Sequence, residues 1–141
     1  MNLAHALAGI NWAAVVVSTV VAFAIGGAWY STALFGNAWL EEVGLTEEAV
    51  NNANMARTFS GAFVLEFFAV MAVAVLIGTD GSWLSGLFNG LMIGVFWIAT
   101  AYGITYLFEQ RSMRLFLINA GYNVVLFTVV GTIIGAWHQS S

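Results

Sequence analysis

Four long apolar runs, separated by short polar segments, are the feature that most constrains the fold. They cover approximately residues 10–34, 58–77, 83–108 and 115–137, and the single charge within them is Glu66. A helix needs about 20 apolar residues to cross the hydrocarbon core, whereas membrane strands are about 10 residues long and alternate in polarity. These runs are longer and do not alternate, so the sequence predicts an all-α, polytopic membrane protein with four transmembrane helices.

Composition agrees with the bilayer as solvent and excludes several kinds of chemistry. Hydrophobic residues make up 61% of the chain and charged residues 7%, against about a quarter charged in soluble domains. Cys and Lys are absent and Arg occurs three times, which argues against thiol or Cys-zinc chemistry and against nucleic acid as a partner. We expect no enzyme activity, cofactor or metal, because catalytic sites need several convergent polar side chains.

The four runs are expected to pair in chain order into two helical hairpins, within a single domain over residues 1–141. Their connections differ in kind, because residues 78–82 and 109–114 are short links, whereas residues 35–57 form a longer connection.

The long connection carries four of the seven acidic residues. Thr46 followed by two acids is typical of a helix start, because its side-chain oxygen can cap the helix and acids favour the positive end of the dipole. The pattern predicts a short helix from about Glu47 that runs into the second transmembrane helix. The acidic side chains are expected to form a solvated face: Glu41, Glu42, Glu47 and Glu48.

The arginines predict an orientation in the cell membrane. Arg57, Arg111 and Arg114 all fall in the first and third connections. Loops rich in Lys and Arg face the cytoplasm. Residues 35–57 and 109–114 are therefore expected in the cytoplasm, with both termini outside.

The two hairpins also resemble each other in sequence. Residues 25–35 align without gaps on residues 98–108, and in the matching register of the second and fourth runs Glu66 falls on Asn123. If the two hairpins are copies, they are parallel repeats related by an axis along the membrane normal, as in some transporters.

Glu66 is the sharpest candidate for function. At 1.5 Å per residue it lies about 12 Å below the loop-side boundary, where an acid costs roughly 3 kcal/mol and usually marks a functional or buried polar site. Asn119, Asn123 and Thr100 fall near the same level. Two interpretations remain open, a proton- or ion-responsive binding site and a hydrogen-bonded group that joins helices.

Glycines recur at helical spacing on the last two runs, at Gly86, Gly90 and Gly94 and at Gly131 and Gly135. Such spacing lets two helices approach closely. The glycines could close the bundle within the chain or join two subunits. A homo-oligomer is a reasonable expectation, because four helices bury little protein surface.

The two histidines, His5 and His138, lie near the same predicted outer face. They could share a metal or titrate near neutral pH. Isolated histidines near chain ends are more often interfacial, which is the interpretation we adopt.

One stretch carries a family resemblance. It comprises Gly-Gly-Ala-Trp-Tyr-Ser at 26–31, Leu-Phe-Gly-Asn-Ala-Trp at 34–39 and Gly-Leu-Thr-Glu-Glu at 44–48. The stretch resembles the signature of the Domain of Unknown Function 1761 family of small membrane proteins, which has Pro where Thr32 stands and a basic residue in place of Asn37.

This resemblance implies a small four-helix membrane protein and supplies no activity. Four aromatic side chains of the motif are expected to gather at the loop end of the first helix and fold the connection back on the bundle. They are Trp29, Tyr30, Phe35 and Trp39.

Two functions fit these features. The first is a transporter-like or ion-coupled protein with its polar site around Glu66. The alternative is a structural or accessory module that binds a partner protein, itself or lipid through the glycine-rich helix faces.

Overall fold

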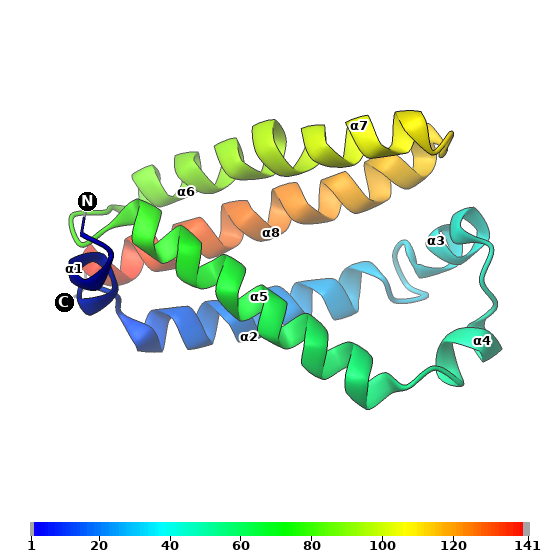
Figure 1. Cartoon of the computed structure of the whole chain (residues 1–141), viewed down its shortest axis with the longest axis horizontal. Coiled ribbons are helices and arrows are strands. Elements are labelled where there is room, and N and C mark those ends of the chain that lie inside the picture. Colours follow the sequence, from blue (N-terminus) through cyan, green and yellow to red (C-terminus); the bar gives the residue numbers. More distant parts are fainter. Residues whose placement is uncertain (1, 140–141) are drawn as a thin grey trace.

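Four long helices form the body of the molecule (Figure 1), as the sequence predicts. The computed structural model describes the backbone of residues 2–139, and no strand occurs in that part of the chain. Each of the four is long and apolar enough to cross a membrane. In chain order they are α2 (Trp12–Trp29), α5 (Met55–Ile77), the continuous unit of α6 (Trp83–Met92), η1 (Ile93–Ala99) and α7 (Thr100–Phe108), and α8 (Met113–Gln139).

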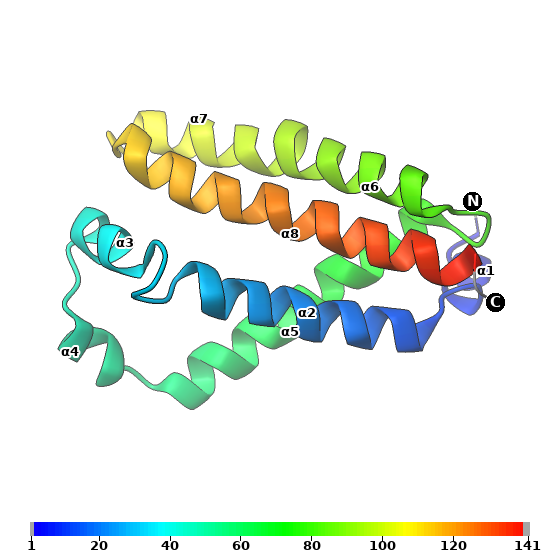
Figure 2. The same ribbon diagram turned by 180° about the vertical axis from the view of Figure 1, so that it is seen from behind.

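Three short helices flank the bundle. α1 (Leu3–Ala8) lies at the same end as the last turns of α8, which we call the terminus end (Figures 1 and 2). α3 (Gly36–Val43) and α4 (Glu47–Asn51) lie at the opposite end, the loop end. The long connection is therefore structured over most of its length.

The first transmembrane helix ends at Trp29, five residues before the end expected from its apolar run. The chain turns sharply there, because the amide of Phe35 donates to the Trp29 carbonyl at 3.0 Å and the amide of Gly36 donates to the Ser31 carbonyl at 2.9 Å. A Cβ at Gly36 would lie 2.4 Å from the Tyr30 carbonyl oxygen. Only glycine fits this turn. A hydropathy pattern does not predict a turn of this kind.

The expectation that the short helix beginning at Glu47 runs into the second transmembrane helix is wrong. α4 ends at Asn51, and α5 begins separately at Met55. The side chain of Asn54 accepts from the amide of Arg57 at 3.0 Å and so caps a new helix. A side-chain acceptor of this kind satisfies a free amide at a helix start, which stabilises the break.

α8 is the central helix, and it packs against α2, α5 and the third transmembrane helix. The side chains at the centre of the core are fully buried and apolar, among them Val15, Val70, Leu126, Val130 and Ile134. α5 contributes to this core only from its terminus-end half, where Val70, Val73 and Ala74 are buried.

The π-helical segment η1 keeps one side of the third transmembrane helix turned toward α8. Gly94 and Gly103 are nine residues apart, which at 3.6 residues per turn places them on opposite faces of a regular α-helix. Yet Gly94 lies against Val124 of α8, and Gly103 lies against Phe116 of the same helix. The wider i→i+5 turns of η1 absorb the difference.

Candidate functional site

A buried asparagine, Asn119, joins three helices near the loop end. The hydroxyl of Tyr30, at the end of α2, donates to Asn119 Oδ1 at 2.7 Å. Asn119 Nδ2 in turn donates to the hydroxyl of Tyr106 on α7, also at 2.7 Å. Asn119 is 8% exposed, and both ends of its amide are satisfied. A buried polar group with its hydrogen bonds made stabilises the packing around it.

Asn123 lies one turn further along α8 and extends this network. Its Nδ2 donates to the backbone carbonyl of Asn119 at 2.8 Å. The rings of Tyr102 and Tyr106 meet edge to face at 5.5 Å. Asn119 therefore joins α8 to α7 through Tyr106.

The four tyrosines of the chain gather in this region, which the sequence interpretation missed. Tyr122 packs edge to face on Tyr30 at 5.3 Å between ring centroids, and Tyr102 and Tyr106 complete the set. A sequence signal was present, because Tyr102 and Tyr106 are four residues apart and share a helix face. Their convergence on Asn119 depends on helix pairing, which no local pattern records.

The aromatic side chains of the family-like motif lie together at the loop end. Trp29 Nε1 donates to the Ile118 carbonyl at 3.0 Å, and its ring lies 4.7 Å from that of Phe35. The rings of Tyr30 and Trp39 meet edge to face at 5.8 Å. These contacts hold the turn after α2 and the start of α3 against α8.

Glu66 lies on the face of α5 that also carries Val70 and Val73, four and seven residues later, and it is half-buried. Within the described part of the chain its carboxylate makes no hydrogen bond or ion pair. Glu66 thus lies on the bundle-facing side of α5 without joining the asparagine network.

The predicted four-residue polar site is only partly assembled. The structure brings Asn119 and Asn123 together, but Thr100 is exposed and its hydroxyl donates to the Phe96 carbonyl of its own helix at 2.6 Å. Serine and threonine hydroxyls commonly bond back in this way inside helices. The sequence prediction grouped these residues by their depth along the helices. Their side chains point in different directions around those helices, so the structure does not bring all of them together.

The two glycine stripes face each other inside the chain. A Cβ at Gly86 would lie 2.0 Å from the Gly131 carbonyl oxygen, and a Cβ at Gly90 would lie 2.0 Å from that of Phe127. A Cβ at Gly94 would lie 2.7 Å from Val124 Cα, and a Cβ at Gly135 would lie 2.1 Å from the Ser82 carbonyl oxygen. The third transmembrane helix and α8 are therefore in backbone contact, and these faces are not open to a partner.

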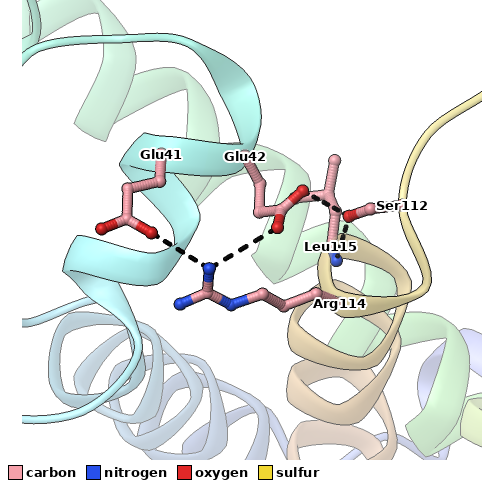
Figure 3. Close-up of polar contacts among 5 residues, drawn as sticks. All are labelled: Glu41, Glu42, Ser112, Arg114 and Leu115. Carbon is pink, nitrogen blue, oxygen red and sulfur yellow. Dashed lines mark hydrogen bonds and ion pairs between the residues drawn. The ribbon is translucent and has the colours of Figure 1, made fainter.

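An ionic clamp ties α3 to the start of α8 (Figure 3). Arg114 Nη1 lies 3.0 Å from Glu41 Oε2 and 3.7 Å from Glu42 Oε1. The hydroxyl of Ser112 donates to Glu42 and accepts from the Leu115 amide at 3.0 Å. Glu41 keeps the solvated position expected of it, with its side chain 68% exposed, whereas the side chain of Glu42 is only 20% exposed and contacts the start of α8.

The two histidines belong to segments at the terminus end. His5 is exposed and borders an open cavity of about 600 Å³ that Gly78 and Thr79 also line. The side chain of His138 lies outside the described residues. No group of three potential His, Cys, Asp or Glu ligands occurs in the described part of the chain.

These features define the class of protein: a multi-pass membrane protein built from four transmembrane helices. A family model described as "Protein of unknown function (DUF1761)" matches residues 13–135. The chain belongs to this family, which confirms the resemblance drawn from the aromatic motif. No curated protein and no solved structure matches it.

Proposed function

We propose that this protein is a small ion-coupled membrane protein in which Glu66 binds a proton or a small cation during transport. The proposal places it in the cell membrane with residues 35–57 and 109–114 in the cytoplasm and assigns it no catalytic reaction. The observation that carries it is a half-buried carboxylate, midway along a transmembrane helix, with no bonding partner among the described residues.

Energetics support a functional role for this carboxyl. An acid inside the membrane costs roughly 3 kcal/mol on insertion scales, and a side chain kept only for packing would avoid that cost. The asparagine amides that could have donated hydrogen bonds to it are bonded to tyrosines and to their own helix. Glu66 is thus available to take up a positive charge.

The position of Glu66 on α5 also supports the proposal. Val70, four residues further along the same face, is fully buried, whereas every residue from 56 to 65 is exposed. Glu66 therefore stands where α5 leaves the bundle. A carboxyl at such a boundary contacts the bundle on one side and lies next to the exposed half of α5 on the other.

The test is flux through the purified protein in liposomes under a pH gradient and under sodium or potassium gradients. Glu66→Gln keeps the shape of the side chain but removes its charge, and we expect at least a roughly tenfold fall in rate. Glu48→Gln, an exposed loop acid, is the matched control and should keep the wild-type rate. An unchanged rate in Glu66→Gln, or no flux above that of empty liposomes, would overturn the proposal.

The orientation is tested separately with single introduced cysteines. These can be labelled selectively, because the chain itself contains no cysteine. A single cysteine in place of Glu48 should react with an impermeant thiol reagent only from the cytoplasmic side. A cysteine in place of Ser82 should react only from outside. The reverse pattern would contradict the proposed orientation without bearing on Glu66.

The alternative function is an accessory module that binds a partner protein, itself or lipid. The glycine faces are occupied within the chain, so such a module would need another surface. The exposed first half of α5 is the observation that favours this alternative. Recovery of a stable complex from native membranes, with flux absent, would favour it over transport.

A further inference from the structure

A groove lies between α7 and α8 at the loop end, where the link between the two helices turns (Figure 1). It is open to the surroundings and has a volume of about 240 Å³. Arg111 lines it at the link, outside the transmembrane spans. The groove therefore crosses the boundary between hydrocarbon and headgroups, because its small and apolar lining residues belong to the spans: Gly103, Leu107, Met113 and Phe116.

The walls of the groove are preformed and face outward. Tyr106 lines it, and this side chain is held by the hydrogen bond from Asn119 Nδ2 at 2.7 Å. Leu107 and Met113, which line it from α7 and α8, are 74% and 69% exposed. Ligand sites are usually preformed and mainly apolar, with a few polar groups that fix the orientation of the ligand. The groove has this composition, and in a membrane protein the molecule next to such an outward surface is lipid.

The polar end of the groove carries one cation and one anion side by side. Arg111 Nε lies 3.4 Å from Glu109 Oε2, and the two side chains are 46% and 50% exposed. Neither makes another ion pair among the described residues, whereas Arg114, the other cation of this link, is paired with Glu41 and Glu42. The terminal guanidinium nitrogens of Arg111 and the second carboxylate oxygen of Glu109 therefore have no ionic partner in the described part of the chain.

This charge pair distinguishes among the lipids that could occupy the groove. An anionic headgroup would gain Arg111 but would place its net negative charge beside Glu109. A headgroup with both a phosphate and a primary ammonium satisfies both side chains, because guanidinium donates to phosphate and ammonium donates to carboxylate. A trimethylated choline nitrogen has no hydrogen to donate and is recognised instead by aromatic cages.

We propose that the groove binds a phospholipid with an ethanolamine headgroup. Its phosphate lies on Arg111, its ammonium on Glu109, and part of an acyl chain lies in the apolar part of the groove. The inference goes beyond the proposed function, because the site is formed by α7, α8 and their link, whereas Glu66 belongs to α5.

Native mass spectrometry of the purified protein in mild detergent tests the headgroup. Three lipids with identical acyl chains are compared: phosphatidylethanolamine, phosphatidylcholine and phosphatidylglycerol. Phosphatidylethanolamine should bind about tenfold more tightly than either of the others. Equal binding of the three would indicate a general coat of lipid, and a preference for phosphatidylglycerol would indicate a site for anionic lipid. Either result would overturn the proposal.

Substitutions at the charge pair test the two contacts separately. Glu109→Gln removes the charged acceptor for the ammonium and should abolish the preference for phosphatidylethanolamine over phosphatidylcholine. Arg111→Gln should weaken the binding of both lipids about tenfold, because both contain the phosphate. Arg57→Gln, at an exposed arginine of another connection, is the matched control and should leave the affinities unchanged. An unchanged preference in Glu109→Gln, or equal effects of Arg111→Gln and Arg57→Gln, would contradict the assignment.

A variant that fills the groove tests the acyl contact without a change in charge. Leu107→Trp should lower the affinity for phosphatidylethanolamine several-fold. Ile104→Trp is the control, because Ile104 is 60% exposed on the same helix but does not line the groove. Wild-type affinity in Leu107→Trp would show that the lipid does not enter the groove. Glu66→Gln should keep the wild-type lipid preference, so failure of the flux assay and failure of the lipid assay are distinguishable.

Discussion

The two hairpins of this molecule are built in different ways. The third transmembrane helix and α8 are in backbone contact through facing glycines such as Gly86 and Gly131. α2 and α5 meet through buried side chains at the terminus end and then diverge, and the glycines at 27 and 61 face open space. Glycines therefore line a close helix–helix contact in the second hairpin, which we call the closed seam, and an exposed surface in the first hairpin.

The difference teaches where the molecule is fixed and where it is free to change. Backbone contact leaves no side chain to rearrange, so the second hairpin and the tyrosine network on it form a rigid frame. The first half of α5 is held by the ring of Phe23 and by the connection through α4. Glu66 stands at the boundary between the fixed and the free parts.

The largest expected effect comes from breaking the closed seam. Gly90→Val would place a Cβ 2.0 Å from the Phe127 carbonyl oxygen, so the helices must separate. We expect a loss of about 3 kcal/mol in the free energy of unfolding, measured by titration from mild detergent into dodecyl sulfate. Gly27→Val, at an open position, is the control. A similar loss in both variants would show that the hairpins do not differ in this way.

The second effect concerns the polar frame. Asn119→Leu removes the acceptor for Tyr30 and the donor for Tyr106, so we expect a loss of about 2 kcal/mol in unfolding free energy. Asn89→Leu is matched, because among the described residues the Asn89 amide donates only to the Ser85 carbonyl of its own helix. Asn89→Leu should lower the free energy of unfolding by clearly less than Asn119→Leu does. Equal losses of unfolding free energy in the two variants would show that a hydrogen bond between helices contributes no more than one within a helix.

A smaller effect is expected at the aromatic connection of α5. Phe23→Leu keeps most of the apolar volume but removes two edge-to-face contacts, each of the kind worth about 1 kcal/mol. The first half of α5 should then move more, which spin-label distances between that half and α2 would record as a broader distribution. Phe88→Leu, on the exposed side of α6, should leave the distribution unchanged. A narrow distribution in Phe23→Leu would show that α5 is held elsewhere.

The smallest effect concerns the ionic clamp. Arg114→Gln removes the ion pairs to Glu41 and Glu42, and exposed pairs of this kind contribute about 0.5 kcal/mol. Global stability should hardly change, but amide hydrogen exchange in α3 should speed up. High salt should produce the same increase in the wild type, because ions screen exposed charges. Unchanged exchange in α3 would mean that the aromatic contacts alone hold it.

Hydropathy predicted the four helices because the bilayer imposes a length and a polarity on every segment that crosses it. It could not place the end of the first helix, which depends on backbone hydrogen bonds around Gly36, nor the break before Met55, which depends on the Asn54 cap. The first feature lies within an apolar run, and the second lies in the asparagine-rich residues 51–54.

The site was predicted from depth along the helices, and depth carries no information on the direction of a side chain. Counting residues from the membrane boundary put Glu66 and Asn123 at one level, yet Asn123 bonds to its own helix and Glu66 makes no hydrogen bond or ion pair within the described residues. The convergence of Tyr30 and Tyr106 on Asn119 joins positions far apart in the sequence. Such contacts follow from the way helices rotate against one another, which the apolar pattern leaves open.

The π-helical segment at Ile93–Ala99 has a consequence for sequence comparison within the family. A π turn holds one more residue than an α turn spanning the same height, so it behaves as an insertion absorbed within a helix. A relative one residue shorter here can keep the glycines on one side of the segment and the tyrosines on the other aligned with α8. We therefore expect single-residue length differences among family members to fall at 93–99, and alignments that shift such a gap into the loops will pair the wrong faces.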